Sequence, residues 1–232
     1  MSQEYPLDAW YAVSGAAGLE AGDVMPVRLF GEERVAWRGD DGHSHVWQNS
    51  CVHRGMRLQY GYVDGNRLAC RYHGWRFGGD AHCEFIPAHP EMTPPDDYCI
   101  PAFQSAEKGG LIWTTAGKPA DSPPEFRGNG EPVFCRTVTV NASPATVGKY
   151  IAALSKQEIA PGYLLIQETY REFEIAVVVA VQPTDTHSCQ LHVSSAPASS
   201  EQHTQALRLH VSAWARRTRD AIETESLKET AA

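Results

Sequence analysis

Hydrophobic and polar positions follow two different patterns along the 232 residues of this chain, one in each half. In the first half, short runs rich in β-branched and aromatic residues, separated by Gly and Asp, predict strands. The clearest of these runs are Arg34–Trp37, His45–Gln48, Arg67–Ala69 and Arg76–Phe77. The first half is therefore expected to be rich in β-structure.

The second half carries a continuous apolar run, followed by a helical period. Phe173–Gln182 predicts a buried strand, and Ser188–Ser194 predicts its neighbour after an intervening turn. From about Glu201 to Leu227, apolar residues recur three and four positions apart, which predicts a long helix with Ser200 as its N-cap candidate. This order of elements indicates an α+β chain.

Composition and charge narrow the range of functions. The chain carries 20 Lys and Arg against 28 Asp and Glu, and this net charge of −8 argues against nucleic acid or an anionic membrane as partner. No apolar run approaches the roughly 18–20 residues of a membrane span, and the polar start MSQEYPLDAW is unlike a signal peptide. We expect a soluble, cytoplasmic protein of one large domain or two small ones.

Two of the six cysteines have a histidine at metal-ligand spacing. Cys51 and His53 form a C-x-H pair, and Cys70 and His73 form a C-x-x-H pair further along. A glycine follows each pair, which lets the loop turn tightly and aim backbone amides at a negatively charged centre. Two thiolates and two imidazoles suit either a tetrahedral zinc ion or a [2Fe–2S] cluster of Rieske type.

The residues around the two pairs favour the cluster. The stretch CVHRGMRLQYGYVDGNRLACRYHGWRF resembles the Rieske domain of aromatic-ring-hydroxylating and related oxygenase large (alpha) subunits. The resemblance rests on C-x-H-R-G from Cys51 and on C-x-Y-H-G-W-x-F from Cys70, and it extends from Trp10 to Trp113. It implies a Rieske [2Fe–2S] cluster whose cofactor-binding, metal-ligating residues are Cys51, His53, Cys70 and His73.

The resemblance also implies a class of Rieske centre. Met56 and Tyr72 stand where respiratory Rieske proteins carry disulfide-bonded cysteines, so the lower-potential oxygenase or ferredoxin class is implied. The remaining thiols lack paired ligand spacing and are interpreted as buried or incidental; they are Cys83, Cys99, Cys135 and Cys189. His43 and His45, in and beside a Gly/Asp turn, are expected to be solvated.

Oxygenases of the resembled family hold a mononuclear non-haem iron on two histidines and a carboxylate in a second domain. No histidine occurs between His89 and His187, so the segment Val140–Leu154, where the family places a ligand-bearing helix, offers none. His187 and His192 are an odd number apart in a run interpreted as a strand, and are expected to face opposite sides. We therefore expect no mononuclear iron(II) in this chain.

The family places its carboxylate ligand on the last helix, at the position of Asp220 in this sequence. Without a histidine pair, one carboxylate binds iron poorly, so Asp220 is interpreted as a solvated helix charge. His203 and His210 lie seven residues apart on the same helix, a rise of about 10.5 Å, which is too far for one iron.

These patterns predict two domains. Residues 1–115 are expected to form a β-rich Rieske [2Fe–2S] domain, and residues 116–232 a truncated helix-on-sheet domain that resembles the oxygenase catalytic domain and ends in a helix. Gly109–Gly130, rich in Gly and Pro, is expected to link them. The catalytic residues and the substrate stay unassigned.

Three functions stay open. The first is electron transfer from a reductase or ferredoxin to a partner iron centre, with a catalytic oxygenase partner and, by family resemblance, a homo-oligomer such as a trimer. The second is a complete Rieske non-haem iron oxygenase, a hydroxylase or demethylase with an atypical iron site. The third is a non-catalytic redox-sensing or assembly subunit. The missing histidine pair favours electron transfer.

Overall fold

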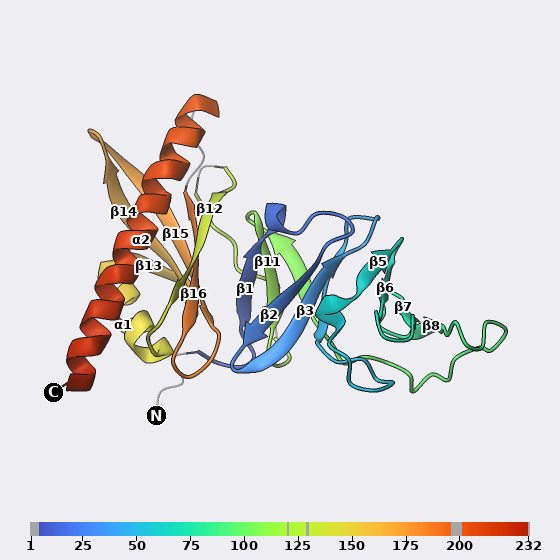
Figure 1. The fold of residues 1–232 in the computed structure, drawn as a ribbon. Helices are drawn as coiled ribbons and strands as arrows, with labels where there is room; N and C mark the ends of the chain where they lie inside the picture. The colour runs from blue at the N-terminus through green and yellow to red at the C-terminus, as the bar shows by residue number, and fades with distance from the viewer. Residues whose placement is uncertain (1–4, 120, 129, 196–200, 232) are drawn as a thin grey trace. The chain divides into compact units, whose positions relative to one another are not determined.

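The computed structural model describes residues 5–119, 121–128, 130–195 and 201–231. Their strands and two α-helices divide into two compact units (Figure 1). One unit consists of Ala16–Arg28 and Glu32–Ala106, and the other takes the described residues up to Gly15, Leu29–Gly31 and the chain from Glu107 onward. Neither helix of the described chain combines the length and apolar character that crossing a bilayer requires.

The first unit is built from two four-stranded sheets. In spatial order, the first sheet consists of β2 (Val24–Leu29), β3 (Glu32–Arg38), β4 (Ser44–Gln48) and β9 (Ala102–Phe103). The second consists of β5 (Tyr62–Asp64), β6 (Arg67–Ala69), β7 (Arg76–Phe77) and β8 (Cys83–Phe85). The four strands predicted around the cysteine–histidine pairs are confirmed.

The second unit contains a five-stranded sheet and a three-stranded sheet. The larger sheet consists, in spatial order, of β12 (Val133–Val140), β16 (Cys189–Ser195), β15 (Phe173–Pro183), β14 (Tyr163–Tyr170) and β13 (Ser155–Ala160). The smaller consists of β1 (Trp10–Gly15), β11 (Leu111–Thr115) and β10 (Ser105–Lys108). The helices are α1 (Pro144–Leu154) and α2 (Glu201–Ala231), which crosses a face of the larger sheet in Figure 1.

Strand β15 is apolar from Val177 to Val181, where both of its faces are covered. Val177, Val179 and Val181 lie in a core that also contains Val211 and Trp214 of α2. The intervening residues, Val178 and Ala180, pack in a second core with Leu111 and Trp113 of β11. The predicted buried strand is thus confirmed, and the helix-on-sheet arrangement confirms the α+β class.

The structure differs from the sequence expectations at two places. Strand β11 lies inside Gly109–Gly130, because the β-branched and aromatic residues Leu111–Thr115 favour a strand despite their glycine-rich surroundings. His187 lies in the turn before β16, so it does not share a strand with His192. The N-cap expected at Ser200 falls outside the described residues.

The compact units also place β1 and β11 with the second half of the chain, whereas the expected boundary follows residue 115. The physical reason is the second face of β15, which β11 covers with Trp113. Burying that face stabilises the sheet by removing apolar surface from water.

Candidate metal centre

Two loops of the first unit carry the cysteine–histidine pairs, and their backbones are built alike. In the first loop, the Cys51 N–H donates to the Met56 carbonyl at 2.8 Å and the Gly55 N–H donates to the Cys51 carbonyl at 2.8 Å. In the second, the Cys70 N–H donates to the Trp75 carbonyl at 2.8 Å and the Gly74 N–H donates to the Cys70 carbonyl at 2.9 Å. Each cysteine therefore begins a loop that closes on itself five residues later.

Glycine closes both loops for a conformational reason. Gly55 has a φ of 69° and Gly74 a φ of 71°, in the left-handed region that other residues rarely adopt. The strands on either side hold the loops, since β6 leads directly to Cys70 and β7 follows Trp75. The sequence expectation of two glycine-closed loops held between strands is confirmed.

The two cysteine side chains lie together in the core of the first unit. Cys51 is 3% exposed and Cys70 is 2% exposed, and both pack in the same apolar cluster. A hydrogen bond from the Cys51 thiol to the Cys70 sulfur raises the pKa of Cys51 and lowers the pKa of Cys70. The two thiols, one from each loop, thus lie next to each other in the buried core.

Backbone amides also point at each sulfur. The N–H groups of His53 and Arg54 donate to Cys51, and this lowers its pKa against the effect of Cys70 and of burial. The N–H groups of Tyr72 and His73 donate to Cys70 and likewise lower its pKa. These amides compensate negative charge on sulfur without a charged side chain.

The two imidazoles also come together, on the solvent side of the sulfurs. The ring centroids of His53 and His73 are 4.6 Å apart, and His73 is exposed while His53 is partly exposed. Partial desolvation, the neighbouring His73 and the Arg54 cation lower the pKa of His53, which favours its neutral form. A neutral imidazole is the form that binds a metal.

The His53 ring is the outer member of a stack of aromatic rings. The His53 ring lies parallel to Trp75, with centroids 4.5 Å apart and an interplanar angle of 3°. Trp75 in turn stacks on Tyr98 at 5.1 Å. Trp75 belongs to the C-x-Y-H-G-W-x-F motif, but its contact with the histidine of the other loop cannot be read from the sequence.

The four side chains fit a two-iron centre. A sulfur pair and an imidazole pair, each contributed by both loops, match the division of a Rieske cluster, in which one iron has two thiolates and the other two imidazoles. Nowhere in the described part of the chain do three or more His, Cys, Asp or Glu side chains gather as ligands of a single ion. The donor set divides into two pairs, one for each iron of such a cluster.

The remaining cysteines and histidines have other surroundings. No disulfide joins any of the six cysteines, all of which lie among the described residues; Cys83 and Cys189 are buried, whereas Cys99 and Cys135 are partly exposed. His45 corrects an expectation: it is only partly exposed, and it stacks on the buried Trp37 with centroids 4.4 Å apart. The turn beside it places His45 on β4, directly opposite Trp37 of β3, which the local sequence does not reveal.

A helix does occupy the segment where the family places its iron-binding histidines. Helix α1 begins after Ser143, whose Oγ accepts the Thr146 N–H at 3.1 Å, and it contains no histidine. Asn141, just before it, donates through its backbone and side-chain nitrogens to Glu223 Oε1 of α2, at 2.8 and 2.9 Å. Asn141 and Glu223 thus hydrogen-bond to each other at this position.

Asp220 behaves as a surface charge. Its carboxylate lies 2.6 Å from the Arg219 guanidinium, and its side chain is 63% exposed. It borders a shallow hollow of about 660 Å³ between α1 and α2, which is also lined by Tyr150, Thr224 and Lys228 but by no histidine.

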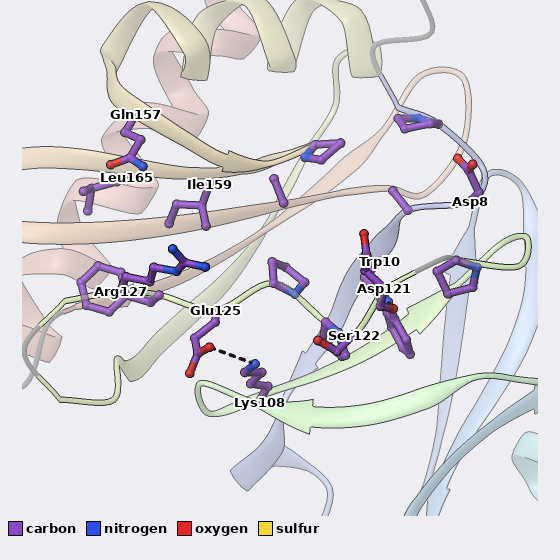
Figure 2. Close-up of a pocket in the computed structure, with 18 residues that line it drawn as sticks. Asp8, Trp10, Lys108, Asp121, Ser122, Glu125, Arg127, Gln157, Ile159 and Leu165 are labelled. Carbon is purple, nitrogen blue, oxygen red and sulfur yellow. Dashed lines mark hydrogen bonds and ion pairs between the residues drawn. The ribbon is translucent and has the colours of Figure 1, made fainter.

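A larger cleft, of about 750 Å³, lies elsewhere in the second unit (Figure 2). Its apolar lining includes Trp10, Phe126, Ile159 and Leu165, and Lys108 Nζ lies 3.4 Å from Glu125 Oε2 across it. No histidine or cysteine lines this cleft, so it lacks the ligands of a redox metal site. The sequence does not signal the cleft, because its walls come from segments far apart in the chain.

Comparison with known proteins agrees with the loop geometry. Residues 9–104 match the sequence profile of the family described as the Rieske [2Fe-2S] domain. This part of the chain is therefore a Rieske domain, and its cofactor is a [2Fe–2S] cluster.

Oxygenases and an oxidoreductase are among its relatives. Oxidoreductase NdmD of Pseudomonas putida is 39% identical over 118 residues, which are 50% of this chain and 20% of that protein. Chlorophyllide a oxygenase of Chlamydomonas reinhardtii is 35% identical over 119 residues, 50% of this chain and 18% of that protein. The chain thus spans about a fifth of the length of these relatives.

The likeness of fold extends further than the likeness of sequence. A crystal structure of dicamba monooxygenase bound to dicamba superposes with a TM-score of 0.74 at 16% identity, over 97% of this chain and 88% of that one. The second half therefore shares its fold with dicamba monooxygenase, and the Rieske domain in the first half has oxygenases among its sequence relatives.

Proposed function

We propose that this chain is an electron-transfer protein of an oxygenase-like redox system, which receives electrons from a reductase or ferredoxin and passes them to an iron centre in a partner protein. The observation that supports it most is the arrangement of the two loops, with paired sulfurs in the core and paired imidazoles at the surface. A buried redox centre with an exposed ligand edge is suited to exchanging electrons with another protein.

In this proposal Cys51 and Cys70 hold one iron, and His53 and His73 hold the other. When bound, the cluster accepts and releases one electron at a time. The apolar core around the cysteines excludes water from the sulfurs. The four backbone amides that point at Cys51 and Cys70 stabilise the negative charge there. The His73 edge reaches solvent and gives electrons their shortest route to a partner.

The second half supports a role in electron transfer over oxygen activation. Helix α1 offers no histidine, and Asp220 is paired with Arg219. We propose that no mononuclear iron binds here and that a catalytic oxygenase partner supplies the reactive iron. We further propose a homo-oligomer, such as the trimer that the family resemblance implies, located in the cytoplasm and with a domain boundary after residue 115.

Iron counting tests this proposal. The purified chain, reconstituted without oxygen, should hold about two irons, and reduction should produce a Rieske-type electron paramagnetic resonance signal. Added ferrous iron should not raise the count. Cys51→Ser should lose the signal, while Cys83→Ser, which changes another buried thiol, should keep it. A third iron that reacts with dioxygen would instead establish a complete oxygenase, a hydroxylase or demethylase with an atypical site.

A further inference from the structure

The part of the chain that carries the two loops is positively charged, although the whole chain is acidic. Residues 51–79 contain five arginines and one aspartate, a net charge of +4, within a chain of net charge −8. The rest of the chain therefore carries −12. Such a separation of charge creates a local field that attracts anionic surfaces to one place.

Three of these arginines are paired with a carboxylate and two are not. Arg57 pairs with Glu33 at 2.9 Å, while Arg67 and Arg76 share Asp64 at 3.3 and 2.9 Å. Arg54 and Arg71 are exposed, and the described residues provide neither of them with a carboxylate. The two unpaired arginines thus lie beside His53 and Cys70, in the two loops.

Apolar side chains accompany these two arginines. Tyr72 is 59% exposed and Val52 is 40% exposed. The Tyr72 ring lies 3.9 Å from the His73 ring, and the His53 and His73 rings join the two loop ends. Exposed Tyr and Arg side chains around an apolar centre are typical of protein–protein interfaces.

We propose that this surface, the cationic tip formed by Val52, Arg54, Arg71 and Tyr72, docks an acidic electron-transfer protein. This proposal rests on the proposed function, and it names the chemistry of the partner. Arg54 and Arg71 steer a negatively charged surface toward the tip, and Val52 and Tyr72 exclude water once the surfaces meet. The docked partner then lies against the exposed edge of His73.

A protein is favoured over a lipid bilayer as the occupant. The cationic tip offers two free arginines and two apolar side chains, whereas stable binding to an anionic membrane takes a larger basic cluster or a longer apolar anchor. The charge of −12 on the rest of the chain would also be repelled by an anionic membrane. A protein surface can match the small tip alone.

Stopped-flow kinetics test the docking surface, with a reduced, acidic plant-type ferredoxin as the probe. Replacing both free arginines (Arg54→Gln with Arg71→Gln) should lower the second-order rate of cluster reduction about tenfold at low salt and flatten its dependence on ionic strength. The matched control, Arg216→Gln with Arg217→Gln, removes two exposed charges from α2 and should stay within about twofold of the parent.

A small uncharged reductant, photoreduced deazaflavin, separates docking from changes in the cluster itself. Its rate should be the same in all three proteins. Equal ferredoxin rates in the tip variant and the parent, or an equal loss in the α2 control, would overturn the docking surface and leave the proposed function standing. Absence of a Rieske signal from the parent protein would instead refute the proposed function.

Two further measurements can also overturn the choice of partner. The parent should not sediment with phosphatidylserine vesicles. In sedimentation-velocity runs, the parent and the tip variant should have the same sedimentation coefficient at low and at high salt, because neither associates with itself through the tip. Vesicle binding through the tip would replace the acidic protein by a membrane. Self-association through the tip would replace it by a second copy of this chain.

Discussion

At the scale of single residues, the four proposed ligand side chains differ in exposure, since the cysteines are buried and the histidines reach solvent. The Cys51 and Cys70 sulfurs lie in an apolar core and are served by backbone amides, whereas the His73 ring reaches solvent. Imidazole brings no formal charge, so a cluster with two imidazoles has less negative charge than one with four thiolates. Replacing a single ligand therefore has a predictable effect on the reduction potential.

His73→Cys should retain a cluster but lower its potential by roughly 100 mV or more, because a thiolate adds negative charge that opposes reduction. A redox titration followed by electron paramagnetic resonance measures the shift. His89→Cys, which places a new thiol at an exposed position outside the loops, should leave the potential where it is. A potential that does not change in His73→Cys would contradict its assignment as a ligand.

A second histidine shows how far burial alone can change a residue. The His192 ring is completely buried in the larger sheet, with Nδ1 2.8 Å from Thr137 Oγ1 and Nε2 2.7 Å from Gln182 Oε1. Burial lowers the pKa of His192 from 6.5 to about 3. The folded protein thus keeps this ring neutral while the unfolded chain takes up a proton.

This difference makes stability depend on pH. The unfolded state binds the extra proton below pH 6.5, so the free energy of unfolding should fall as the pH drops from 6.5 towards 3, by up to about 1.4 kcal/mol per pH unit. In His192→Gln this contribution should disappear, so the loss of stability between pH 7 and pH 5 should be smaller by about 2 kcal/mol. Urea unfolding at the two pH values measures it. His187→Gln, at an exposed turn, is the control; an unchanged slope in His192→Gln would argue against neutral burial.

At the scale of elements, the two loops share a backbone but not their surroundings. A Cβ added at Gly74 would lie 2.9 Å from Pro87 Cγ, whereas one added at Gly55 would meet only Ser50 Oγ, at 3.8 Å. Both positions have left-handed φ, so alanine is strained at either one. The second loop is additionally confined by the chain that follows β8.

We therefore expect Gly74→Ala to lose more iron per chain and more thermal stability than Gly55→Ala. The shared φ strain is worth about 1–2 kcal/mol at either site, and the clash with Pro87 adds to it only at Gly74. Combining Gly74→Ala with Pro87→Ala should bring the iron content back to that of Gly55→Ala. Iron and acid-labile sulfide assays after reconstitution measure this, and equal losses in the two single variants would exclude a role for Pro87.

At the scale of the whole molecule, the two compact units do not follow the order of the sequence, because the packing of apolar faces decides which strands belong together. Strands β1 and β11 flank the segment that forms the first unit, yet they belong to the second. Trp113 of β11 is 1% exposed and packs with Val178 and Ala180 of β15. The two units can therefore be destabilised separately.

Trp113→Ala should lower the free energy of unfolding of the second unit by roughly 3–5 kcal/mol, the usual cost of removing a buried tryptophan. Far-ultraviolet circular dichroism in urea should show this loss, while the visible absorbance of the cluster should disappear at the same urea concentration as in the parent. Trp37→Ala, in the core of the first unit, should do the reverse. Early loss of the cluster in Trp113→Ala would show that a division after residue 115 describes the energetics better.

Much of the centre could be predicted from the sequence because its signals are local. Each cysteine, its histidine and the closing glycine lie within five residues, so their spacing alone indicates a metal-binding loop. The strands around the loops and α2 follow from hydrophobic period for the same reason. Contacts such as Trp75 on His53, or Trp37 on His45, could not be predicted, because they join segments whose separation in sequence carries no periodic signal.

The sequence by itself determined the candidate ligands, the loops that present them and the lack of histidine in Val140–Leu154, since each depends on residue type and short spacing. Only the tertiary structure decided that thiol meets thiol and imidazole meets imidazole, and that Arg54 and Arg71 stay free beside them. The tertiary structure also decided that β11 belongs to the second unit. Those outcomes depend on which distant segments pack against each other and bury apolar surface, and this burial is a property of the folded chain and not of any single segment.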